Sequence, residues 1–103
     1  MTLKDVKNML EGTGLPVAYR AWPEAQAPPL PYICYLDAYS NNFPADGCAY
    51  LPIKHIQIEL YTRLKEPMTE DKVEQALSSL FWEKTETYID TEGCYQILYE
   101  IEV

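Results

Sequence analysis

The stretch that decides the fold is Ile53-Lys54-His55-Ile56-Gln57-Ile58-Glu59-Leu60-Tyr61-Thr62-Arg63-Leu64. Its apolar residues Ile56, Ile58 and Leu60 recur at every second position. The positions between and around them carry polar or amphipathic side chains, namely His55, Gln57, Glu59, Tyr61 and Arg63. Alternation with a period of two predicts a β-strand with one buried face and one wetter face.

A helix and two further strands are predicted after this strand. Glu66-Pro67 should end the strand, and Thr69 should cap a helix whose first turn is acidic. The helix has an apolar stripe at helical spacing, formed by Val73, Ala76, Leu77, Leu80 and Phe81. Strands are expected at 83–89 and 94–103, with 90–93 as the hairpin turn between them.

Before the central strand, the sequence predicts a short helix, two strands and two irregular segments. The helix should cover residues 3–11, capped by Thr2 with Asp5 three residues on. Strands are predicted at 17–22 and 32–39. The connector 23–31 holds four prolines, which oppose both helix and ladder pairing. Residues 40–47 contain Asn, Pro, Asp and Gly and are predicted to form a long polar loop.

Taken in order, these elements predict one α+β domain over residues 1–103. The order is helix, strand, strand, strand, helix, strand, strand. Strands joined by short turns favour a mainly antiparallel sheet of about four to five strands. The two amphipathic helices are expected to pack on one face of that sheet.

Charge and composition exclude several classes of partner. The chain of 103 residues carries 16 acids against 8 bases, a net charge of −8. Such a chain repels nucleic acids and anionic membranes, so we expect no direct nucleic-acid binding and no membrane binding. The N-terminus does not read as a signal peptide. The chain has three cysteines, Cys34, Cys48 and Cys94, which is an odd number, and they are far apart in the sequence. This pattern is typical of free thiols in a reducing compartment, so a cytosolic location is expected.

The sequence offers no recognisable catalytic, metal or cofactor site. His55 is the single histidine, and the cysteines lack the spacing of zinc ligands. A Cys–His dyad between His55 and Cys34, Cys48 or Cys94 is formally possible, but no local motif favours it. The four glycines fit turns or helix ends rather than a phosphate loop. We therefore expect a protein that is not an enzyme.

An excess of tyrosine points to binding surfaces instead. Nine of the thirteen aromatic residues are tyrosines, which suit a surface that is wet before assembly and buried after it. Phe43 stands in the predicted polar loop, where it either tucks back as an anchor or meets a partner. The residues we expect at an interface are Asn41, Asn42, Phe43, Asp46 and Tyr61.

Five segments of the chain resemble a group of small phage and prophage proteins of Gram-positive bacteria. These segments are Tyr19-Arg20-Ala21-Trp22-Pro23, Pro28-Pro29-Leu30-Pro31-Tyr32, Tyr39-Ser40-Asn41-Asn42-Phe43 with Ala45-Asp46, Ile58-Glu59-Leu60-Tyr61-Thr62 and Tyr95-Gln96-Ile97-Leu98-Tyr99-Glu100-Ile101. The proteins concerned look like the tail-completion or tail-terminator class of long-tailed phages, encoded among head–tail joining genes.

The resemblance implies an α+β subunit that assembles with itself, commonly as a hexameric ring. The ring would end the tail tube and dock to the head connector, so the expected partners are tail-tube and head-connector proteins. The expected location is the host cytoplasm during assembly and then the virion tail. The alternative from another class is a small cytosolic binding or inhibitor protein, including an acidic DNA mimic, although the acids are spread over all segments.

Overall fold

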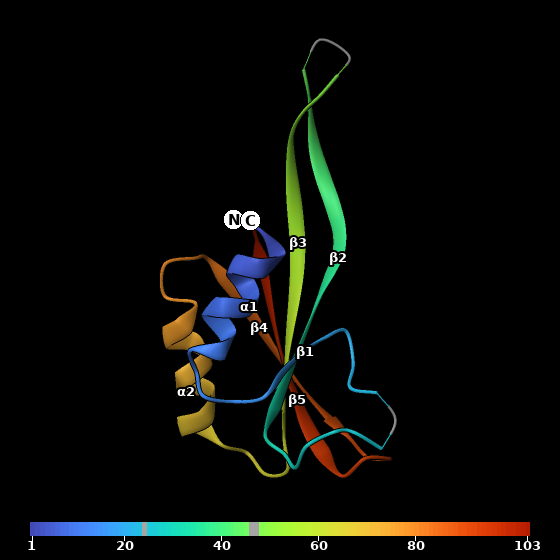
Figure 1. Ribbon diagram of the computed structural model, residues 1–103, viewed down its shortest axis with the longest axis vertical. Helices are drawn as coiled ribbons and strands as arrows, with labels where there is room; N and C mark the ends of the chain where they lie inside the picture. The colour runs from blue at the N-terminus through green and yellow to red at the C-terminus, as the bar shows by residue number, and fades with distance from the viewer. Residues whose placement is uncertain (24, 46–47) are drawn as a thin grey trace.

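The computed structural model describes residues 1–23, 25–45 and 48–103, and the side chains of these residues apart from 40–52. Two helices and five strands follow one another along the chain (Figure 1). Their bounds are α1 Leu3–Glu11, β1 Val17–Tyr19, β2 Tyr32–Ala45, β3 Cys48–Thr62, α2 Pro67–Ala76, β4 Trp82–Ile89 and β5 Cys94–Glu102. The predicted α+β class and element order are confirmed.

The five strands form one sheet in the order β1-β2-β3-β5-β4. All neighbours are antiparallel except β1, which pairs parallel with β2 from Val17↔Ile33 to Tyr19↔Tyr35. Both helices lie on one side of the sheet (Figure 1). This side of the sheet is called the helix face below, and the other side the open face.

The core lies between the helices and the helix face, as the alternation predicts. Ile56, Ile58 and Leu60 on β3 are buried, with their neighbours on β5. The full buried cluster is Val6, Leu10, Ile33, Tyr35, Ile56, Ile58, Leu60, Val73, Leu77, Ile97, Tyr99 and Ile101. Burying twelve large side chains at roughly 1.5–3 kcal/mol each is the main driving force that holds the two layers together.

Local signals set the ends of α1 and of the β4–β5 hairpin. The Thr2 hydroxyl accepts from the Asp5 amide, and the Asp5 carboxylate accepts from the Thr2 amide, which completes a capping box. In the hairpin, Gly93 adopts a positive φ of 62° and its amide donates to the Ile89 carbonyl. Both features agree with the sequence prediction.

The second helix differs from the prediction at both ends. It begins at Pro67, because proline suits the first helical position, and its N-cap is Glu66. Thr69 therefore lies inside the first turn, where its hydroxyl donates to the Glu66 carboxylate. Phe81 lies beyond the helix and is 82% exposed, so its predicted place in the apolar stripe is wrong.

Residues 40–45 of the segment 40–47, which was predicted to be a loop, belong to the strand β2. β2 continues to Ala45 and β3 starts at Cys48, and their pairing runs out to Ala45↔Cys48. We call residues 41–45 of β2 with 48–53 of β3 the β-arm. It extends beyond the rest of the sheet and makes the molecule 49 Å long (Figure 1). Turn-forming residues occur here because only two strands pair, without a third to exclude them.

A β-bulge lies at the base of the β-arm. Asp37 pairs with Ile56 and Tyr39 pairs with His55, so Ala38 is an extra residue on β2. Ile56 belongs to the helix face, whereas His55 belongs to the open face. The bulge thus places Asp37 and Tyr39 on opposite faces, although residues two apart in a regular strand share a face.

Candidate assembly interface

The β-arm has no neighbouring strand on either side in the part of the chain that the structure describes. On one side, β1 pairs with β2 only as far as Tyr35. On the other side, the pairing of β3 with β5 ends where Lys54 and Val103 exchange backbone hydrogen bonds of 3.0 Å. An isolated two-stranded ribbon is marginally stable in water, and its unpaired backbone groups are a template for another strand. The β-arm therefore has the character of a binding element.

The chain leaves the edge of β2 at Arg20. The Arg20 amide donates to the Tyr35 carbonyl at 2.7 Å, and Arg20 then adopts a left-handed φ of 65°, which is strained for a residue with a side chain. Val17–Tyr19 is consequently the whole of β1. The last contact on this edge is the Asp37 amide, which donates to the Tyr19 hydroxyl at 3.2 Å. Above Asp37 the edge of β2 is uncovered in the described structure.

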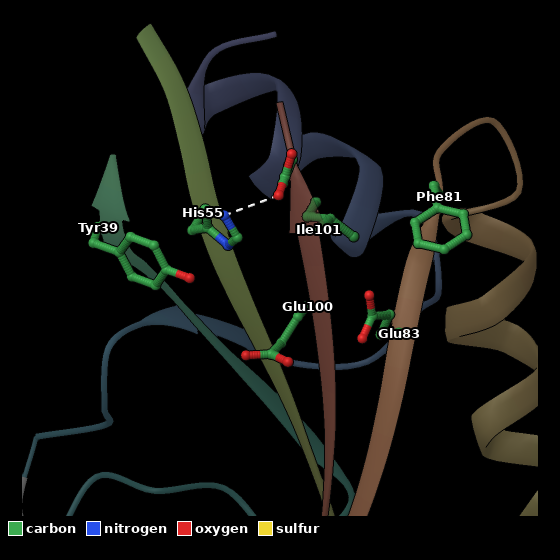
Figure 2. Close-up of a pocket in the computed structure, with 7 residues that line it drawn as sticks. Tyr39, His55, Phe81, Glu83, Glu100 and Ile101 are labelled. Carbon is green, nitrogen blue, oxygen red and sulfur yellow. Dashed lines mark ion pairs between the residues drawn. The ribbon is translucent and has the colours of Figure 1, made fainter. Parts of the chain in front are cut away.

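A hollow of about 580 Å³ lies on the open face at the base of the β-arm. The rings of Tyr39 and His55 stack there, 4.2 Å apart. The His55 Nε2 atom lies 2.9 Å from the Glu102 carboxylate, shown as a dashed line in Figure 2. Glu83 and Glu100 face each other across β4 and β5 in the same hollow. The hollow is acidic, with exposed aromatic rings of Tyr39 and Phe81 at its margins (Figure 2).

Tyr61, the predicted interface residue on β3, lies in a second hollow of about 550 Å³ lined by the proline-rich connector. Its hydroxyl donates to Glu59 at 3.0 Å and accepts from Gln96 at 3.0 Å, and its ring lies 5.4 Å from that of Tyr32. Burial raises the pKa of the Tyr61 hydroxyl strongly. Tyr61 is therefore half-buried in a network of its own chain rather than offered freely to a partner.

The other predicted interface residues belong to the β-arm and its tip. The backbone of Asn41, Asn42 and Phe43 lies in β2, so these residues belong to a strand instead of the predicted loop, and their interface role stays a prediction. Their side chains lie outside the described residues, as does the whole of Asp46. The sequence pattern missed Tyr39, Phe81 and the acidic hollow, because they meet only through strand register.

His55 forms no dyad with either described cysteine. Cys34 pairs with Glu59, four residues along β3 from His55, which corresponds to about 13 Å. Cys94 lies at the far end of β5 from Glu102, the residue that pairs with His55. Burial raises the pKa of the Cys34 thiol to about 11, which keeps it protonated near neutral pH. The Cys48 side chain lies outside the described residues.

Among the described residues, no group of three or more His, Cys, Asp or Glu side chains could hold a metal ion. Neither described helix has the length and apolar character needed to cross a membrane.

Comparison with known proteins identifies no relative of this chain. No protein-family model matches the chain, no curated protein is similar to it, and no solved structure matches it. The function must therefore be argued from the residues and from the geometry of the chain itself.

Proposed function

We propose that this chain is a structural subunit of a phage or prophage head–tail joining region. In this role it is a tail terminator, which closes into a ring, commonly of six copies, ends the tail tube and docks to the head connector. The subunit acts by assembly and not by chemistry.

The observation that carries the proposal is the β-arm with its two uncovered edges. The β-arm extends beyond the pairing of β3 with β5, and among the described side chains the buried cluster reaches Ile56 and Ile101 at this end of the sheet. Its unpaired backbone is satisfied fully only when another chain lies beside it. A ring subunit needs such a surface, since each copy must hold its neighbour through a heterologous contact.

Charge distribution supports the same role. Residues 41–53 contain one charged residue, Asp46, although the chain as a whole has a net charge of −8. Copies of an acidic protein repel one another, and the repulsion is weakest where charges are fewest. A nearly neutral β-arm on an acidic body therefore suits association between identical copies.

The test removes the β-arm and leaves the rest of the sheet. Because Asn41 pairs with Ile53, an Asn-Gly turn can join these two residues in place of 42–52. The shortened variant should fold with nearly unchanged thermal stability but stay monomeric, whereas the full chain should form a ring by light scattering and electron microscopy. A matched control exchanges Asn41 and Asn42 for threonine, which keeps both strands.

A second experiment tests the tail-terminator role itself. Removal of the gene from its phage or prophage should yield overlong tails that are not joined to heads. Supplying the full chain should restore tails of normal length, whereas supplying the shortened chain should not. Tails of normal length without the protein would contradict the proposal. A full chain that stays strictly monomeric and binds a DNA-processing enzyme would favour the inhibitor class instead.

A further inference from the structure

The sheet has a free edge at each end. At one end, β2 is uncovered above Asp37, where β1 has turned away. At the other end, β4 is the outermost strand and pairs only with β5 over Trp82–Ile89. Proteins usually protect such edges with prolines, bulges or free charged side chains, because a bare edge accepts a foreign strand.

The usual protective features are missing from β4. It contains no proline, and its register with β5 is continuous from Trp82↔Ile101 to Ile89↔Cys94. Two of its charged side chains are drawn onto the helix face by ion pairs. Lys84 binds Glu70 and Glu74 on α2, and Glu86 binds Lys65. These charges therefore do not project from the edge to repel an incoming strand.

The edge of β2 is similarly open. Residues 39–43, above the bulge at Ala38, contain no proline and no charged residue. Pro44 follows directly and marks the upper limit of an edge that can donate continuous backbone hydrogen bonds. The free part of β2 thus offers five residues in regular register, which can pair with part of the eight residues of β4.

We infer that the uncovered edge of β2, residues 39–43, pairs with β4 of a second copy of this chain. The inference rests on the proposed ring and names the contact that closes it. Each copy would donate one edge and receive the other, which is the head-to-tail arrangement that a ring requires. Backbone pairing needs no opposite charges, so it suits a chain with a net charge of −8.

The direction of the pairing follows from the strand order. Along β2, β3, β5 and β4 every neighbour is antiparallel, so β4 runs opposite to β2. Rotation about a ring axis keeps the up or down sense of each strand. The β2 strand of the next copy therefore meets β4 as an antiparallel neighbour, and one continuous sheet surrounds the ring.

The register follows from the tilt of the strands. Within one copy, Trp82 lies level with Asp37, so an untilted ring would place the free part of β2 above β4. Closed sheets tilt their strands by about 35–45°. Over four strand spacings of about 4.8 Å, such a tilt shifts the next copy by roughly four to six residues. Because Ala38 is an extra residue on β2, a shift of six levels sets Asn41 opposite Thr85.

Disulfide capture tests this register in the full-length chain. We would introduce Asn41→Cys and Thr85→Cys together in a Cys48→Ser background; Cys34 and Cys94 are buried. Within one copy the two positions lie on strands that are three spacings apart and at different levels, far beyond the Cα separation of about 7 Å that a disulfide spans. Mild oxidation should therefore give a ladder of linked copies, whereas either single-cysteine variant should give no species beyond a dimer.

Amide hydrogen exchange of the unmodified protein provides a second measurement that needs no variant. Backbone amides in 39–43 and 82–89 should exchange more slowly in the ring than in dilute monomer. Rings that form without the Asn41–Thr85 ladder and without this protection would overturn the edge pairing while leaving the proposed function in place. Absence of any self-association would overturn the proposed function and the edge pairing with it.

Discussion

The ammonium group of Lys84 on β4 lies 2.6 Å from the carboxylate of Glu70 on α2, a side chain that is only 2% exposed. Lys65 approaches the same carboxylate at 2.7 Å. The hydroxyl of buried Tyr99 donates to the neighbouring Glu74 at 2.8 Å. This cluster fastens α2 to the sheet through charge, alongside the apolar contacts of Val73 and Leu77.

Replacement of Lys84 should destabilise the fold because it leaves Glu70 buried with one cation instead of two. Breaking a buried ion pair costs about 3–5 kcal/mol. Since Lys65 remains and Lys84 keeps some contact with water, we expect Lys84→Met to lower the free energy of unfolding by about 1–2 kcal/mol. Urea denaturation measures this. Lys72→Met, on the exposed side of α2, is the control and should change little.

Acid should weaken the same cluster. The two lysines outweigh the effect of burial and hold the pKa of the Glu70 carboxyl below its ordinary value of 4.5. A group with a lowered folded-state pKa contributes stability above its unfolded pKa, and this contribution disappears as the pH falls through the folded value. The stability difference between the native chain and Glu70→Gln should therefore be present at pH 7 and shrink below about pH 4.5. A difference that stays constant down to pH 3 would contradict the assignment.

The capping box should matter for α1 because this helix has only nine residues. We expect Thr2→Ala to cost about 1 kcal/mol, since it leaves the Asp5 amide without its side-chain acceptor. For a chain of this length the corresponding loss in Tm is about 4–8 °C. Thr2→Ser, which keeps the hydroxyl, should retain most of the native Tm in the same thermal scan.

Phe43→Ala should weaken assembly without loosening the fold. Phe43 lies on the β-arm, beyond the sheet that covers the core, so the melting temperature should stay within about 1–2 °C of the native value. The concentration at which copies associate should rise, as measured by light scattering. A large drop in melting temperature would instead mean that the phenyl ring is part of the core.

The regular parts of the fold could be predicted because their signals are local. The alternation through Ile56, Ile58 and Leu60 identified both the strand and its buried face, and the Thr2 and Gly93 signals identified an N-cap and a turn. These features depend on residues within a few positions of one another, so the sequence alone carries them.

The features that the sequence did not reveal depend on distant pairing. Residues 40–47 have the composition of a loop, and only the pairing of β2 with β3, which continues past a register shift between Phe43 and Pro44, makes 40–45 strand. The burial of Glu70 could not be predicted from the sequence, because its partner Lys84 is fourteen residues away on another element. The acidic hollow likewise needs β3, β4 and β5 to be placed side by side.

The extra residue Ala38 has a consequence for evolution and for engineering. Because a strand alternates strictly, an extra residue that took part in the pairing would exchange the two sides of everything that follows. The bulge leaves Ala38 out of the pairing, so Tyr39 lies opposite His55 and stacks on it. Deletion of Ala38 would therefore keep Tyr39 opposite His55, whereas a further residue inserted here and paired in register would transfer the ring of Tyr39 to the side of α1.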